Sequence, residues 1–190
     1  MAHPSPLSDD PRATGARAEA GAEPSADRAF RSVASPAPCD DVAVRDLGLD
    51  AFETGVLAVL RHLCAGFAAP GGPAWHTAFA IASERWGPVR GPVVVTGLLP
   101  ILYALADTRQ APFRTMDALS LAARQWATPD EARLLRLLAA MRRDATAAAR
   151  CEVAALAEGR NDPALIAAVL TFAARYAIRA THPAQQRLLH

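Results

Sequence analysis

Residues 91–106, GPVVVTGLLPILYALA, constrain the fold most because they form a long run without a single charged side chain. As a helix these sixteen residues extend only about 24 Å, whereas the hydrocarbon core of a bilayer is about 30 Å thick. Arg90 and Asp107 flank the run, so it cannot be lengthened without burying a charge, and Pro100 predicts a kink in its middle. A helix that is apolar on all sides but too short to span a membrane is typical of a bundle centre. We therefore predict a buried helix in a water-soluble bundle.

The rest of the sequence predicts an all-α fold built as a single globular bundle of about six helices. Hydrophobic residues make up 52% of the chain but aromatic residues only 6%, so Ala, Leu and Val supply most of the apolar mass and favour helix. No segment alternates convincingly between apolar and polar residues with the period of a strand. The expected helices cover approximately residues 50–68, 74–86, 92–106, 115–126, 129–158 and 163–176.

The domain organisation follows from composition. Residues 1–41 are rich in Pro, Ala, Ser and Arg and contain few large apolar side chains, which predicts a disordered tail. Residues 42–182 are expected to form the all-helical domain, and residues 183–190 a short C-terminal tail. The N-terminal segment resembles a transit peptide in its Ala, Arg and Ser content, but acidic residues argue against one, among them Asp9, Asp10, Glu19, Glu23 and Asp27.

Three helix starts carry specific capping signals. Asp50 and Glu53 have the spacing of a capping box. Thr128, followed by Pro129 and by Glu131, has the same spacing with proline in the first helical position. Asp162 followed by Pro163 predicts the start of the last helix, directly after Gly159 has ended the one before it. The short connection predicts that the last two helices form an antiparallel hairpin.

Charge and cysteine content exclude several classes of function. The formal net charge of +1 provides no general attraction to nucleic acids or anionic lipids, so nucleic-acid binding is not expected. The chain contains no lysine, which excludes a Schiff-base lysine and a Walker A lysine, and its Ala and Arg content is typical of a GC-rich bacterium. Cys39, Cys64 and Cys151 form no CxxC pair, and we interpret them as reduced thiols of a cytoplasmic protein.

Metal and cofactor sites are not indicated. His62 and Cys64 are the most suggestive pair, but residues two apart on a helix point about 200° away from each other. They cannot chelate one ion from the same face, so we expect no metal and no cofactor.

Two groups of residues are candidate binding sites. The first is an aromatic cluster that could line a ligand pocket between helices or simply fill the core; it consists of Trp75, Phe79, Trp86 and Tyr103. The second is a row of arginines on one side of the expected long helix, which could contact an anion or a protein partner or be a solvated face; it consists of Arg133, Arg136, Arg143 and Arg150.

No catalytic motif is present in the sequence, which contains neither GxSxG nor HExxH nor a glycine-rich phosphate loop. We assign no catalytic residue, although an enzyme stays open because folds host sites that no motif reveals. The leading hypothesis is a non-catalytic helical interaction module, an adaptor, accessory or regulatory subunit that binds another protein. The alternative is a bundle that binds or converts a small molecule in the aromatic cluster. A homodimer is compatible with the Ala-rich helices, and a membrane association is not expected.

Overall fold

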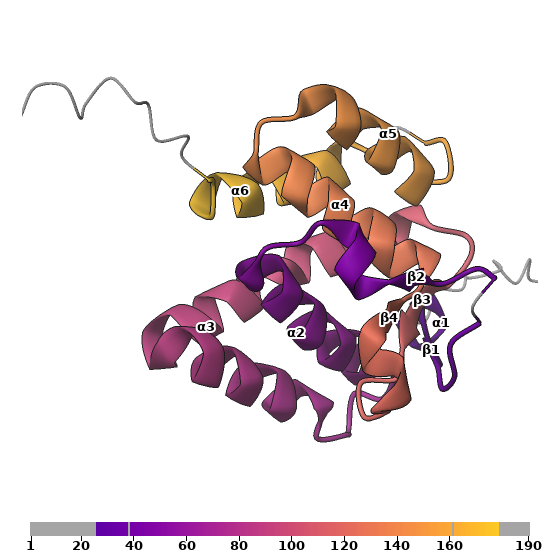
Figure 1. The fold of residues 1–190 in the computed structure, drawn as a ribbon, viewed down its shortest axis with the longest axis vertical. Helices are drawn as coiled ribbons and strands as arrows, with labels where there is room; N and C mark the ends of the chain where they lie inside the picture. Colours follow the sequence, from indigo (N-terminus) through magenta and orange to yellow (C-terminus); the bar gives the residue numbers. More distant parts are fainter. Residues whose placement is uncertain (1–25, 38, 161, 179–190) are drawn as a thin grey trace, which may run out of the picture.

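Helices dominate the computed structural model, which describes residues 26–37, 39–160 and 162–178 (Figure 1). In this part of the chain five helices are longer than one turn: α2 Ala51–Ala68, α3 Ala74–Thr108, α4 Pro129–Arg142, α5 Thr146–Leu156 and α6 Pro163–Arg175. A single turn, α1 Ala26–Ala29, and two 3₁₀ turns, η1 Val44–Leu47 and η2 Ala122–Gln125, complete the helical elements. The mostly helical class is thus confirmed. The predicted disorder of residues 1–25 and the predicted tail 183–190 lie outside the described residues.

Two small sheets at one end of the bundle differ from the all-helical expectation. β1 Phe30–Val33 pairs in parallel with β3 Phe113–Met116, and β2 Val42–Ala43 pairs antiparallel with β4 Trp126–Ala127. The predicted helix over residues 115–126 is therefore wrong: this segment contains the end of β3, a turn, η2 and the start of β4. Pairing with a strand about 80 residues earlier overrides the local helical preference.

The folded unit also begins earlier than residue 42. Phe30, which we expected in the tail, is only 4% exposed. Its ring centroid lies 5.0 Å from that of Phe67 and 6.0 Å from that of Phe113. A single large apolar residue in a polar segment thus anchors β1 to the helices.

The number of helices differs from six for three reasons. Two expected helices are joined in α3, one expected helix is divided into α4 and α5, and the helix expected over residues 115–126 does not form. The expected helices 74–86 and 92–106 are the two arms of α3, separated by Gly87 at φ 84° and ψ 164°, a conformation that glycine tolerates readily. The expected helix 129–158 is instead divided into α4 and α5, because Asp144 takes a positive φ of 56°. The bend in α3 folds its arms together so closely that a side chain at Gly91 would meet the backbone of Ala82 at 2.5 Å.

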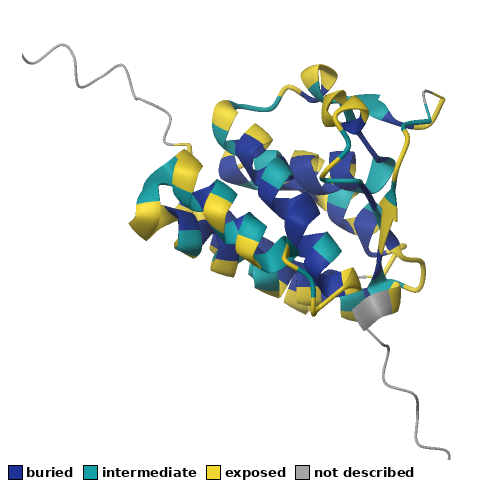
Figure 2. Ribbon diagram, turned by 90° about the horizontal axis from the view of Figure 1, so that it is seen from below, coloured by how far each residue is buried: buried dark blue, intermediate teal, exposed yellow. Residues whose placement is uncertain are grey.

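α2 lies at the centre of the molecule, in contact with α3 and α4, while α6 contacts both α3 and α4 (Figure 1). The buried residues gather between these helices, and exposed residues cover the outside (Figure 2). The apolar run 91–106 contributes six large side chains to this core: Val94, Val95, Leu98, Ile101, Leu102 and Leu105. The run therefore has a buried face.

Two helices, α2 and α3, are long and apolar enough to cross a membrane by length and hydropathy alone. In their most apolar windows 67% of the residues of α2 and 44% of those of α3 are buried inside the protein. Core helices pass the same test, so the finding is weak support for a membrane span.

All three predicted helix starts are confirmed. The Asp50 and Thr128 side chains accept the N–H of Glu53 and Glu131, and the two glutamate side chains in turn accept the N–H of the cap residue. Asp162 accepts the N–H of Ala164.

Candidate functional site

The four aromatic residues of the predicted ligand cluster do not surround one cavity. Trp75 covers Gly66 of α2 and donates from Nε1 to its carbonyl at 3.1 Å, whereas Trp86 covers Gly55 about three turns away. At both positions a Cβ would lie less than 3 Å from the indole, so each ring occupies the space left by a glycine. Phe79 packs against the core between them, and Tyr103 is half exposed on the edge of Phe67. None of the three cavities described below is lined by these four residues.

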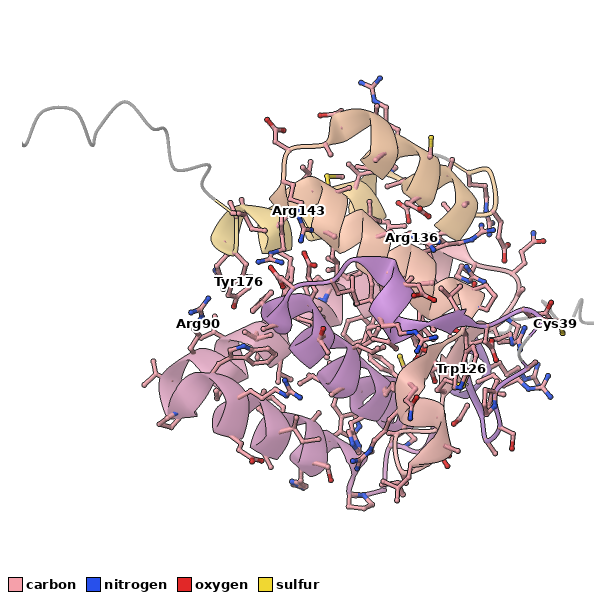
Figure 3. All side chains as sticks on the ribbon, in the orientation of Figure 1. Cys39, Arg90, Trp126, Arg136, Arg143 and Tyr176 are labelled. Atoms are coloured by element: carbon pink, nitrogen blue, oxygen red, sulfur yellow. The ribbon has the colours of Figure 1, made fainter. Side chains whose placement is uncertain are left out.

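The arginine row is also broken up, because the helix that was expected to carry it is divided. Arg133 and Arg136 are exposed on α4, and neither makes an ion pair with a described residue. Arg143 lies at the end of α4, apart from Arg136, and binds Glu53 through Nη1 at 2.7 Å (Figure 3). Arg150 belongs to α5 and lines a groove there.

The most unusual surface is that of α6, whose first twelve residues, PALIAAVLTFAA, contain no charge. Leu165, Val169 and Phe172 point into the core. The opposite side is exposed and still apolar apart from one hydroxyl; it comprises Ala164, Ala167, Leu170, Thr171 and Ala174. A helix at a protein surface normally has a polar outer face, so this one is a candidate contact surface.

A groove runs along one side of α6, between it and α5. It has a volume of about 560 Å³. Its floor is formed by apolar side chains, among them Met141, Ala149, Val153 and Ile166, and Leu170 stands at its edge with half of its surface exposed. The charged residues along it are Asp144, Arg150 and Arg160. Arg160 has Glu158 as a neighbour at 3.5 Å, whereas Arg150 makes no ion pair within the described residues.

A second groove, of about 450 Å³, separates the other side of α6 from the middle of α3. Gly97 allows α3 to approach Phe172 closely here, and Thr96, Pro100 and Arg175 line the groove. Tyr176 also lines it and is only 7% exposed, yet its hydroxyl finds no hydrogen-bond partner among the described residues. Burial raises the pKa of Tyr176, so this hydroxyl is a neutral donor.

We name the exposed side of α6 together with its two flanking grooves the α6 surface. Its only charged residues are Asp144 and three arginines, Arg150, Arg160 and Arg175. An apolar strip with a positive rim is suited to binding rather than to chemistry, because no acid or base is positioned over it. Within the described residues no group of three or more His, Cys, Asp or Glu side chains lies close enough to hold a metal ion.

Known proteins add nothing to this geometry. Comparison of the chain with protein-family models, curated proteins and solved structures finds no match.

The sequence reasoning missed the α6 surface, although its signal was readable. Besides the buried apolar residues of α6, Ala164, Ala167, Leu170 and Ala174 leave the other side of the helix without a charged residue. In a chain with many arginines, twelve helical residues without a charge indicate that both sides of the helix are in use.

Proposed function

We propose that the protein is a non-catalytic interaction module of the cytoplasm, and that the α6 surface binds an amphipathic helix of a protein partner. The observation that carries the proposal is the uncharged outer face of α6 between two grooves. Helix-in-groove recognition uses apolar anchors spaced three to four residues apart, and parallel grooves beside an exposed helix accommodate such anchors.

The rim favours a partner with acidic residues beside its apolar stripe. Arg160 is paired with Glu158, so Arg150 and Arg175 against Asp144 leave the α6 surface a small positive excess, which steers an acidic segment toward it.

Leu170→Asp tests the proposal, because it places a charge in the centre of the strip at a position exposed enough for the fold to tolerate it. We expect the substitution to weaken partner binding about tenfold or more, as for a residue in the centre of an interface. Leu119→Asp is the matched control, since Leu119 is also an exposed leucine, at 79%, but lies in the segment between β3 and η2.

The measurement is affinity capture with the full chain at low and moderate salt, combined with a photo-crosslinking amino acid at Ala167. The amine crosslinkers in common use are unsuitable because the chain has no lysine. Support requires a partner that crosslinks at position 167 and is retained by Leu119→Asp but lost with Leu170→Asp. The absence of any partner, or a partner that Leu170→Asp captures equally well, overturns the proposal. Light scattering measures self-association. If the protein associates with itself through the α6 surface, the partner is a second copy of this chain and the proposal of a different protein partner is wrong.

A further inference from the structure

A third cavity lies on another part of the molecule, between α2, the first arm of α3 and the segment that leads into η2. It has a volume of about 520 Å³, within the range of small-molecule sites. Leu57, Ala58 and Ile81 provide apolar walls, and six polar side chains surround the remainder: Thr54, Arg61, His62, Glu84, Arg85 and Arg124. We call this cavity the polar pocket; it shares no residue with the α6 surface.

His62 is the most informative residue of the polar pocket. Its side chain is nine-tenths buried, with an exposed fraction of 8%, yet neither ring nitrogen has a hydrogen-bond partner among the described residues. Neither nitrogen belongs to the fully buried unpaired atoms, so both keep some access to solvent, and His62 lines the polar pocket. The ring nitrogens are therefore free to bond to a water or to a ligand in this cavity.

Burial also lowers the pKa of His62, although the negative charge of Asp117 opposes the effect. The imidazole is therefore neutral at neutral pH and offers one N–H donor and one acceptor.

The charges around the polar pocket limit what it can bind. Arg61 also lines it, but its charge is balanced by Glu131, with Nε at 2.7 Å from Oε1 and Nη2 at 2.9 Å from Oε2. Arg85 and Arg124 are exposed at the rim and make no ion pair with a described residue. Against these two cations stands Glu84, which leaves one positive charge to be balanced. Asp117 lies behind His62 and makes a dianion still less favourable.

We propose that the polar pocket binds a small organic acid with a single carboxylate and an apolar body. The carboxylate accepts hydrogen bonds from the guanidinium groups of Arg85 and Arg124, which are suited to planar, bidentate recognition. The His62 N–H completes the polar contacts, and the apolar body lies against Leu57, Ala58 and Ile81. The inference is independent of the proposed function, because it concerns other residues and another class of ligand.

A series of linear monocarboxylates from acetate to octanoate, with inorganic phosphate beside them, tests this inference on the full chain. The readouts are isothermal titration and the NMR shift of the His62 ring protons. We expect saturable binding at millimolar concentration or below, tightening several-fold with each added methylene until the pocket is filled. The His62 signals should move with the same saturation curve.

Substitutions at the rim assign the contacts. Arg85→Gln and Arg124→Gln are each expected to weaken binding of the longer acids about tenfold, as for the loss of a charge-assisted hydrogen bond. Arg136→Gln is the matched control, because Arg136 is exposed, lies outside the polar pocket and makes no ion pair with a described residue. The inference is overturned by the absence of saturable binding, by phosphate binding as tightly as the longest acid, or by rim variants that bind like the control.

Discussion

The two capping boxes of the molecule have the same local geometry but a very different environment. At the start of α2 the box is formed by Asp50 and Glu53, and at the start of α4 by Thr128 and Glu131. In both, the glutamate bonds to the cap backbone at about 3 Å and also binds arginine from a distant part of the chain. Each box thus joins a helix start to a tertiary ion pair.

The difference between the boxes lies in where the arginines are. Glu131 is paired with Arg61 alone, both side chains are buried, and Arg61 also donates to the carbonyls of Ala123 and Trp126. Burial raises the pKa of Glu131, while Arg61 and the N–H groups of Thr128 and Met116 oppose the effect.

Glu53 is as deeply buried but has two arginines, and the side chain of Arg143 is 37% exposed (Figure 3). The shared cap motif thus fixes the helix start in both boxes, whereas access of water to the cation decides how much the ion pair contributes to stability.

The largest effect is expected from Arg61→Met, which leaves Glu131 buried without its cation. The free energy of unfolding should fall by about 3–5 kcal/mol, the usual cost of an uncompensated buried charge. Urea denaturation measures it, and Arg133→Met, at an exposed position without an ion pair, should change it by less than about 0.5 kcal/mol.

The same variant separates charge from packing through its pH dependence. Without Arg61 the pKa of Glu131 is raised further, so the folded state takes up a proton at a higher pH than the unfolded state does. The loss of stability is then present above the folded pKa and shrinks as pH falls below it toward the unfolded value. A loss that is the same at pH 4 and pH 8 would show that packing rather than charge is responsible.

An intermediate effect is expected at the capping box of α2, where Arg142 and Arg143 both pair with Glu53. Arg142→Met should lower the free energy of unfolding by about 1–3 kcal/mol, since Arg142 is buried and also donates to the carbonyl of Tyr176 at 2.9 Å. Arg143→Met should cost less than about 1 kcal/mol because water reaches its side chain.

The double variant completes the cycle at Glu53. It should cost more than the sum of the two single changes, since Glu53 then loses both cations. Equal costs for the two single variants would remove the distinction between the buried and the exposed arginine.

The helix starts that the sequence predicts correctly depend only on residues that are close together in the chain. The boxes at Asp50 and Thr128 depend on side chains three residues apart, and the start of α6 depends on the adjacent Asp162-Pro163 pair. Each of these was predicted correctly because no distant residue had to be known.

What the sequence could not reveal depends on distant partners or on a conformation without a marker. The strand at Phe113 exists because it pairs with Phe30, and nothing near either residue indicates the other. The break between α4 and α5 occurs at Asp144, with neither glycine nor proline to announce it. For that reason the sequence predicts one helix that carries the whole row of arginines. In the structure the row is divided, with Arg150 on α5.

The smallest effect is expected from Asp50→Asn, which keeps the cap but removes its charge, because Asn caps helices as well as Asp does. Burial alone would raise the pKa of Asp50, but the Glu53 N–H and the Arg142 guanidinium hold it below its usual value of 3.8. A lowered folded pKa contributes stability above pH 3.8 that is lost as pH falls through the folded value. At neutral pH the variant should therefore be less stable by under about 1 kcal/mol, a small figure because the Asp50 side chain is one-third exposed. The deficit should vanish in acid, whereas Thr128→Ser, which carries no charge, should show a pH-independent difference; a deficit at Asp50 that persists in acid would assign its role to the cap alone.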